Sequence, residues 1–331
     1  MKEYKQDPLL DMFRQSPDQF LSGEEISRKL SISRTAVWKQ INKLRQAGYE
    51  FEALPRMGYR ITETPMPLDE HMLAERLKSQ KFGRKLHILS TTESTQEDAR
   101  LLAEQGASEG TVVLAEEQRS GRGRMGKTFY SPFGKGIFMS IILRPEQPVH
   151  LVQQLTLLCG VAVQKAIEKT TGLKAGIKWP NDVLIGSKKV SGILLESKAE
   201  DDAVRYCIAG LGISVNIPEE GFPDELKPIA TSLKVAGGRS VDRNELIVST
   251  LHELEYLYEL YKEQGFQIIA DMWEASSVTL NRRVAVHTPR GITEGTASGL
   301  HSSGALLIRR DDGEWMPVFS GEIRVVPLDK E

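Results

Sequence analysis

The sequence predicts an α/β (α+β) protein in three parts: an N-terminal winged helix-turn-helix, a central mixed-sheet domain with flanking helices, and a small C-terminal SH3-like β-barrel. Three observations support this. Two short helical patterns and a hairpin pattern begin the chain, strand and helix patterns mix in the middle, and short strands broken by glycines end it. The expected domains are residues 1–64, 65–276 and 277–331, and a length of 331 residues suits two or three domains.

The composition is typical of a soluble globular protein, with 40% hydrophobic and 27% charged residues. We expect a cytoplasmic protein without membrane contact, since the start does not resemble a signal peptide and no apolar stretch could span a bilayer. The longest apolar run, residues 138–143, has the length of a strand. Cys159 and Cys207 lie in apolar surroundings and are expected to be reduced core residues. The six histidines are scattered, so no protein metal site is expected.

The net charge of −2 conceals an asymmetry. Residues 1–62 carry 11 Lys/Arg and 8 Asp/Glu, a net charge of +3, so the remainder of the chain carries −5. A basic end on an acidic chain is typical of a nucleic-acid-binding module, and local motifs must then support that interpretation.

Two short helices joined by a turn are predicted between residues 22 and 46. Ser22 can cap the first helix, with Glu25 at capping-box distance, and Ser33 can cap the second, which Gly48 ends as a C-cap. The predicted core positions repeat at helical spacing: Ile26, Leu30, Val37, Ile41 and Leu44.

Residues 49–53 and 58–62 then alternate like a hairpin, with Arg56 near its tip, and this completes a winged helix-turn-helix. The outer face of the second helix is polar and cationic, as a helix in a major groove requires. The predicted DNA-binding residues are Ser33, Arg34, Thr35, Trp38, Lys39, Lys43 and Arg56. Arg34 and Thr35 would read base edges, and the lysines and Arg56 would contact phosphates. The alternative is a small protein-interaction domain with solvated charges.

The segment ETPMPLD follows, and its Pro65 and Pro67 can neither continue a helix nor pair in a central strand. It predicts a linker.

The strongest chemical signal is the segment from Gln118 to Lys127, QRSGRGRMGK, which holds four cations and three glycines without an acid. Such a loop suits a polyanion, because backbone N–H groups and guanidinium groups can surround phosphate. The glycine spacing also matches the dinucleotide fingerprint, but no helix pattern opens there, and the protein-kinase motifs HRD and DFG are absent. The alternative is a flexible solvated basic loop.

Two further segments bring polar groups to the ends of predicted elements. KWPND, from Lys178 to Asp182, predicts a turn between two strands that holds a cation, an amide and a carboxylate, followed by Lys189 and GILLE. The segment TESTQ opens a helix over residues 96–104, where Ser94 could be an ordinary N-cap or could point, with Thr95 and Gln96, into a pocket. A solvated polar turn and simple helix capping are the respective alternatives.

Together these segments resemble bacterial biotin–protein ligases. GRGRMG resembles the family's GRGRxGR signature, KWPND matches its motif, KVSGILLE resembles its K-x-x-G-I-L-x-E strand, and TEST and GLGISVNI resemble two further segments, all in the family's order. With the winged helix and the terminal barrel, the chain resembles the bifunctional class that also represses the biotin operon.

The resemblance implies a two-step reaction. Biotin's carboxylate attacks the α-phosphate of ATP, which is bound with Mg²⁺, and the biotinyl-5′-AMP intermediate then passes biotin to a lysine of a carboxylase's biotin carboxyl carrier domain. It also implies operator DNA of biotin genes as a partner, biotinyl-5′-AMP as corepressor, and a homodimer when liganded.

The resemblance assigns roles residue by residue. Residues matched to biotin and nucleotide binding are Ser94, Thr95, Gln96, Gln118, Arg122, Gly123, Arg124 and Lys189. Residues matched to catalysis are Lys189, Arg122 and Arg124, and Asp182 is the candidate for orienting the incoming amine. The departures from the family pattern are Gln96 for Asn, Met125 and Lys127 where cations such as Arg are common, and Phe129 for Trp.

Two other functions stay open at this stage. A lipoate-type acyl-adenylating ligase has a related fold, although the basic loop argues against it. A non-enzymatic biotin-responsive regulator is expected to lack Arg122, Arg124 or Lys189, and all three are present.

Overall fold

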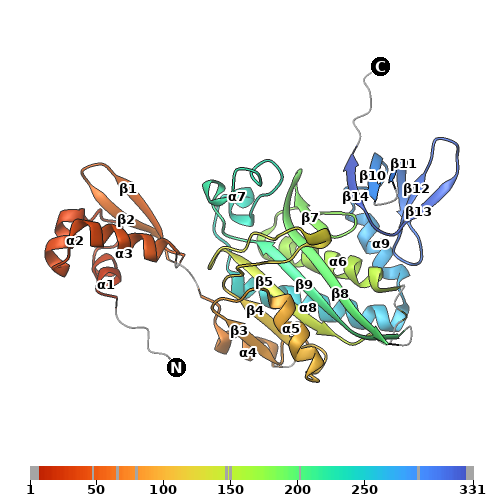
Figure 1. Ribbon diagram of the computed structural model, residues 1–331, viewed down its shortest axis with the longest axis horizontal. Helices are drawn as coiled ribbons and strands as arrows, with labels where there is room; N and C mark the ends of the chain where they lie inside the picture. Colours follow the sequence, from red (N-terminus) through yellow and green to blue (C-terminus); the bar gives the residue numbers. More distant parts are fainter. Residues whose placement is uncertain are drawn as a thin grey trace, which may run out of the picture. The chain divides into compact units, whose positions relative to one another are not determined.

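The computed structural model describes residues 7–46, 48–64, 67–78, 81–145, 148, 151–200, 203–288 and 291–325 (Figure 1). The chain forms two compact units, Met1–Pro67 and Leu68–Glu331. Of the two prolines that predicted a linker, Pro67 is described and Pro65 lies outside the described residues. The domain boundaries expected at residues 64 and 276 stay predictions. In the described residues, no helix is long and apolar enough to cross a membrane.

In its described residues, the first unit has three helices and a two-stranded antiparallel sheet: α1 (Pro8–Gln15), α2 (Gly23–Leu30), α3 (Arg34–Gln46), β1 (Glu50–Leu54) and β2 (Gly58–Glu63). The two predicted helices and the hairpin are confirmed. Ser22 Oγ accepts a hydrogen bond from Glu25 N and Ser33 Oγ accepts one from Ala36 N, both at 3.1 Å, so both predicted caps are present.

Helix α1 was not predicted, although its sequence carries the usual signals. Asp7 caps it, Pro8 occupies the first turn, and Leu9 and Phe13 are buried one turn apart. The unit has its own apolar core, which α1 completes: Leu9, Phe13, Leu21, Ile26, Val37, Ile41 and Leu44. Helix α1 therefore covers the apolar side chains of α2 and α3, which the helix-turn-helix is too small to bury by itself.

The second unit is built on a seven-stranded mixed sheet in the order β3-β4-β5-β9-β8-β7-β6. Only β3 and β4 pair in parallel among the described strands. The strands are β3 (Leu86–Leu89), β4 (Val112–Ala115), β5 (Gly136–Leu143), β6 (Gly176–Lys178), β7 (Asp182–Ile185), β8 (Lys188–Glu200) and β9 (Ala203–Ser214). The apolar run that predicted a strand at 138–143 lies in β5, and the KWPND turn joins β6 to β7.

Helices cover both faces of this sheet (Figure 1). Successive side chains of a strand point to opposite faces, so apolar residues in a row are buried on both sides. In β4, Val112 and Leu114 join the main core with α6 (Val152–Thr171) and α8 (Arg243–Gln264). Val113, between them, faces the opposite way and packs with Ala99 and Ala103 of α5 (Thr95–Glu104). The described part of this unit also holds the helices α4 (Glu70–Leu77), α7 (Leu233–Gly237) and α9 (Gln267–Ala275) and the 3-10 turns η1 (Arg124–Gly126) and η3 (Glu219–Gly221).

Both cysteines lie in the second unit, as free and buried residues. Burial raises the pKa of each thiol to about 12, so both stay protonated near neutral pH. The expectation that Cys159 and Cys207 are reduced core residues is confirmed.

The C-terminal strands form a five-stranded antiparallel sheet in the order β13-β12-β11-β10-β14. They are β10 (Arg283–Thr288), β11 (Gly291–Leu300), β12 (Leu306–Arg309), β13 (Trp315–Val318) and β14 (Glu322–Val325). Residues 319–321, which end at Gly321, separate β13 from β14. Residues 326–331 of the expected third domain lie outside the described residues.

Candidate active site and DNA-binding surface

One cavity of about 530 Å³ in the second unit brings the three central motifs together. Its walls come from the start of α5, the basic loop, the KWPND turn, strands β8 and β9, the segment 222–230 and the start of β14. The predicted site residues that line it are Ser94, Thr95, Gln96, Gln118, Arg122, Gly123, Arg124, Asp182 and Lys189. Every central residue proposed from the sequence therefore lies around a single space, and their roles stay predictions.

Ser94 does not act as an ordinary helix cap. It occupies the N-cap position of α5, but its side chain makes no capping hydrogen bond and Glu97 makes no capping box with it. The side chain is 3% exposed, and its Oγ has no hydrogen-bond partner in the described structure. Because a buried hydroxyl without a partner costs free energy, this atom is suited to a polar ligand group in the cavity.

The neighbouring side chains form a fixed polar network. Thr95 Oγ1 donates to Gln118 Oε1 at 3.0 Å and lies 2.8 Å from Ser140 Oγ, and Gln118 Nε2 donates to Ser131 Oγ at 3.0 Å. Ser140, on β5, was not proposed from the sequence. It is a single polar residue within an apolar run, and nothing else in the sequence indicated a role for it. The network holds Thr95 and Gln118 in fixed orientations at the helix N-terminus.

Gln96, which departs from the family's Asn, is tied into the protein itself. Its Nε2 donates to the carbonyl of Ile208 at 3.0 Å, and its Oε1 accepts from Ser140 Oγ at 3.2 Å. A Cβ at Gly210 would lie 2.4 Å from Gln96 Oε1, so the longer amide fits only because β9 has a glycine at that point. Gln96 thus lines the cavity with both ends of its amide engaged.

Glycines in β8 and β9 make room for two more residues on the cavity floor. A Cβ at Gly212 would lie 2.7 Å from the Phe129 ring, and one at Gly192 would lie 2.7 Å from Lys189 Nζ. The sequence signal was present as glycines inside strand patterns, which indicate close approach of another group. Phe129 stands where the family has Trp, and its ring packs edge-on against Phe138 with a centroid separation of 6.4 Å.

The basic loop is held by backbone bonds across its base. Gly123 N donates to Lys127 O at 2.7 Å, and Phe129 N donates to Gly121 O at 2.8 Å. A Cβ at Gly121 would lie 2.5 Å from the Phe129 carbonyl, so glycine is required for this closure. Met125, at the tip, has a left-handed φ of 56° and is 65% exposed. The basic loop therefore has a defined backbone structure and is not a flexible solvated segment.

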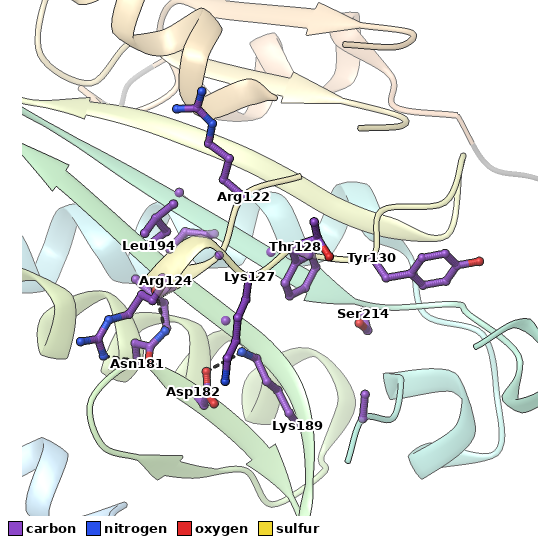
Figure 2. Close-up of a pocket in the computed structure, with 18 of the residues that line it drawn as sticks. Arg122, Arg124, Lys127, Thr128, Tyr130, Asn181, Asp182, Lys189, Leu194 and Ser214 are labelled. Carbon is purple, nitrogen blue, oxygen red and sulfur yellow. Dashed lines mark hydrogen bonds and ion pairs between the residues drawn. The ribbon is translucent and has the colours of Figure 1, made fainter. Parts of the chain in front are cut away.

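The two central arginines of the loop point in opposite directions (Figure 2). Arg122 Nη1 lies 3.3 Å from Glu97 Oε2 on α5, whereas Arg124 Nη1 donates to Asn181 Oδ1 in the KWPND turn at 3.2 Å. Burial lowers the pKa of Arg124, and the negative charge of Asp182 opposes that effect. Among the described residues, the partly desolvated Arg124 guanidinium has only an amide as hydrogen-bond partner, so it gains from an incoming anion.

Lys189 and Asp182 form the shortest ion pair of the site, with Nζ and Oδ1 2.6 Å apart (Figure 2). They lie on adjacent antiparallel strands, and the segment 229–231 bonds to the backbone of Lys189 on the other side. The sequence proposed both residues but not their pairing. Asp182 neutralises Lys189 before any substrate arrives.

The KWPND turn is fixed by the residues around it. Trp179 is 1% exposed, its backbone N donates to Thr279 Oγ1 at 3.0 Å, and its indole donates to the carbonyl of Gly304 at 3.3 Å. Asn181 Nδ2 donates to the Ile193 carbonyl at 2.8 Å, which leaves its Oδ1 for Arg124. The C-terminal sheet therefore supports the turn that carries Asn181 and Asp182, a contact that sequence reasoning missed.

The seven predicted DNA-binding residues are all exposed on the first unit: Ser33, Arg34, Thr35, Trp38, Lys39, Lys43 and Arg56. On α3 these side chains are exposed while Val37 and Ile41 are buried, and Arg56 lies in the turn of the hairpin with a φ of 68°. Trp38 is 55% exposed, which is unusual for an indole without a partner surface. Arg34 pairs with Glu24 at 2.7 Å, and both side chains are open to solvent.

Comparison with protein families assigns each of these regions. Residues 88–214 match the model of the Biotin/lipoate A/B protein ligase family, residues 5–60 match an HTH domain, and residues 279–326 match the Biotin protein ligase C terminal domain. The sheet, the cavity with its basic loop, and the helix-turn-helix thus define a biotin protein ligase with an attached DNA-binding domain.

Similar proteins agree with this class. The chain is 43% identical over 317 residues, 96% of its length and 97% of the relative's, to the "Bifunctional ligase/repressor BirA" of Bacillus subtilis. It is 30% identical to the protein of that name from Escherichia coli, over 94% and 95% of the two chains. The "Biotin protein ligase from Aquifex aeolicus in complex with biotin and ATP" superposes with a TM-score of 0.64 at 33% identity, over 73% of this chain and 99% of that one. This chain belongs to the biotin protein ligase family, in the group of bifunctional ligase/repressors.

Proposed function

We propose that this protein couples biotin to ATP and then to a carrier lysine. The carboxylate oxygen of biotin attacks the α-phosphate of ATP, pyrophosphate leaves, and biotinyl-5′-AMP remains in the cavity. The amine of a lysine on a biotin carboxyl carrier domain then attacks the acyl carbon, loses a proton, and releases AMP.

The observation that carries the proposal is the division of the cavity into two kinds of surface. On one side lie neutral hydroxyl and amide groups, including the unpartnered Oγ of Ser94, which suit the neutral polar ureido ring of biotin. On the other lie Lys189, Arg124 and the basic loop, which suit phosphates. A ligand of the right length would place its carboxylate at the boundary, next to the nucleotide.

We propose that Lys189 supplies the charge that lets two anions react. Its ion pair with Asp182 keeps the ammonium group in the cavity, and an incoming carboxylate and α-phosphate would share it. Asp182, freed in part from Lys189, would then orient the acceptor amine. Mg²⁺ would arrive with ATP and neutralise part of the triphosphate charge.

The basic loop is proposed to retain the intermediate. We expect Arg124→Gly to raise the dissociation rate of biotinyl-5′-AMP about 10- to 100-fold, because a charge-assisted hydrogen bond contributes about 1.5–3 kcal/mol. Biotin activation should continue in part. Release of labelled intermediate from the variant measures this effect. Arg119→Gly is the matched control, since Arg119 belongs to the same loop but does not line the cavity, and equal release from both variants would contradict the assignment.

The direct test of the ligase proposal is intact mass of an acceptor domain after incubation with biotin, ATP and Mg²⁺. The mass should rise by one biotinyl group only when all components are present. An unchanged acceptor refutes the proposal. The lipoate alternative is tested by comparing the thermal shift given by biotin and by lipoate, since a lipoate-type ligase would be stabilised by lipoate alone.

We further propose that the first unit binds a two-fold-symmetric operator of biotin genes and that biotinyl-5′-AMP is the corepressor. A single helix-turn-helix offers few base contacts, and a dimer doubles them and fixes half-sites on one face of the duplex. The intermediate would favour the dimer by fixing the exposed tip of the basic loop on the second unit. Both activities require ATP or chromosomal DNA, so we place the protein in the cytoplasm.

Sedimentation and operator gel shift, with and without biotinyl-5′-AMP, test the repressor proposal. Binding should strengthen with dimer formation and should weaken steeply as salt is raised, because phosphate contacts release counterions. Equal operator binding by a ligand-free monomer would refute the corepressor role and leave the ligase proposal intact.

A further inference from the structure

The cavity contains a second ion pair that links the basic loop to the C-terminal sheet. Lys127 Nζ, at the end of the loop, lies 3.1 Å from Glu322 Oε2, the first residue of β14. Both residues line the cavity. In Figure 2 the Lys127 side chain points from the loop toward the side that holds Lys189 and Asp182. The pair therefore stands at the phosphate-binding side, not on a remote surface.

Glu322 is the fixed member of the pair. It pairs in register with His287 of β10, and a Cβ at the preceding Gly321 would lie 2.5 Å from Val286 Cγ1, so the chain runs close against β10 at this point. The same sheet is tied to the KWPND turn through Thr279 and Gly304. Lys127, by contrast, ends a loop whose 3-10 turn is short and whose tip is exposed. Lys127, on an exposed loop, is thus held by the carboxylate of Glu322, which is fixed in the C-terminal sheet.

Another anion can easily replace the Glu322 carboxylate as the partner of Lys127. The Lys127 side chain is 63% exposed and that of Glu322 is 49% exposed, whereas the Lys189–Asp182 pair is 33% and 25% exposed. Solvent-exposed ion pairs contribute little to stability, so a polyanion that offers several oxygens can replace a single carboxylate. Lys127, Lys178 and Arg324 all lower the pKa of Glu322, so this carboxylate stays ionised at neutral pH amid several cations.

We propose that Glu322 is a positioning residue that holds Lys127 at the cavity until the β- and γ-phosphates of ATP replace it. Lys127 then contacts the pyrophosphate group, and Glu322 takes the lysine back when pyrophosphate leaves. Glu322 touches neither biotin nor the reacting atoms. The inference rests on the proposed ligase function, because it assigns these two residues to the nucleotide's leaving group.

Binding of inorganic pyrophosphate with Mg²⁺ to the full chain, measured by calorimetry, tests this directly. Lys127→Gln should weaken pyrophosphate binding about 10-fold and raise the KM for ATP by a similar factor, with the Kd for biotin unchanged. Glu322→Gln should strengthen pyrophosphate binding about 3- to 10-fold and slow its release, because the competing carboxylate is gone. Glu314→Gln, another exposed carboxylate of the C-terminal sheet that does not line the cavity, should change neither.

The double variant decides whether Glu322 acts through Lys127. In the Lys127→Gln background, Glu322→Gln should change pyrophosphate affinity less than twofold, because the lysine it competes for is absent. An equal effect of Glu322→Gln in both backgrounds would overturn the proposal, since the carboxylate would then act on the ligand itself. Loss of thermal stability with unchanged pyrophosphate affinity in Glu322→Gln would also overturn it, in favour of a merely structural contact. A wild-type protein that transfers no biotin would instead refute the underlying ligase function.

Discussion

Lys189→Ala is expected to lower the rate of biotinyl-5′-AMP formation about 100- to 1000-fold, which is the usual effect of removing one preorganised donor from developing negative charge. Lys189 is the only cation that the structure pairs with Asp182 in the described residues, at 2.6 Å. Without the ammonium group, Asp182 would face two substrate anions and repel them. The measurement is biotin-dependent release of pyrophosphate at saturating ATP.

Lys188→Ala is the matched control for this prediction. Lys188 is the neighbouring residue on β8, so its side chain projects to the other face of the strand, and it does not line the cavity. The double variant Lys189→Ala with Asp182→Asn should regain nucleotide affinity through loss of repulsion, but not the rate. A Lys189→Ala protein that releases pyrophosphate at the wild-type rate would rule out the proposed role.

Arg34→Ala is expected to weaken operator binding about 30- to 25,000-fold while ligation continues unchanged. A base contact of this kind contributes about 1–3 kcal/mol, and a dimer on a two-fold operator loses it twice. In the free protein Arg34 pairs with Glu24, but both side chains are more than 70% exposed, so the pair is weak and can yield to DNA. Gel shift with operator DNA, beside a biotinylation assay of the same preparation, measures both activities.

Two variants of the same unit sharpen this test. Arg14→Ala removes an equally exposed arginine from α1, on no predicted DNA-binding face, and should change operator affinity little. Glu24→Gln should strengthen operator binding, because Arg34 no longer has a competing anion and a negative charge near the DNA is lost. Parallel losses in Arg34→Ala and Arg14→Ala would show that only net charge matters, against a base-reading role.

The sequence by itself determined the features that depend on neighbours along the chain. Helices α2 and α3 begin at serines whose side chains cap them, and Val37 and Ile41 are buried at the predicted spacing. The turn at KWPND and the strand at 138–143 follow from local turn and β-forming residues for the same reason. Helix α1 carried equally local signals at Asp7 and Pro8 and could have been predicted.

The tertiary structure decided which partner each polar group has. Ser94 satisfied the local rules for an N-cap, yet its hydroxyl is buried in a cavity wall and has no partner among the described residues, because β5 and β9, far along the chain, pack against α5. The pairing of Arg122 with Glu97 and of Lys127 with Glu322 joins residues 25 and 195 positions apart. Local propensities do not predict pairs between residues so far apart in the sequence. Such pairs depend on the order and register of the strands, which many residues determine together.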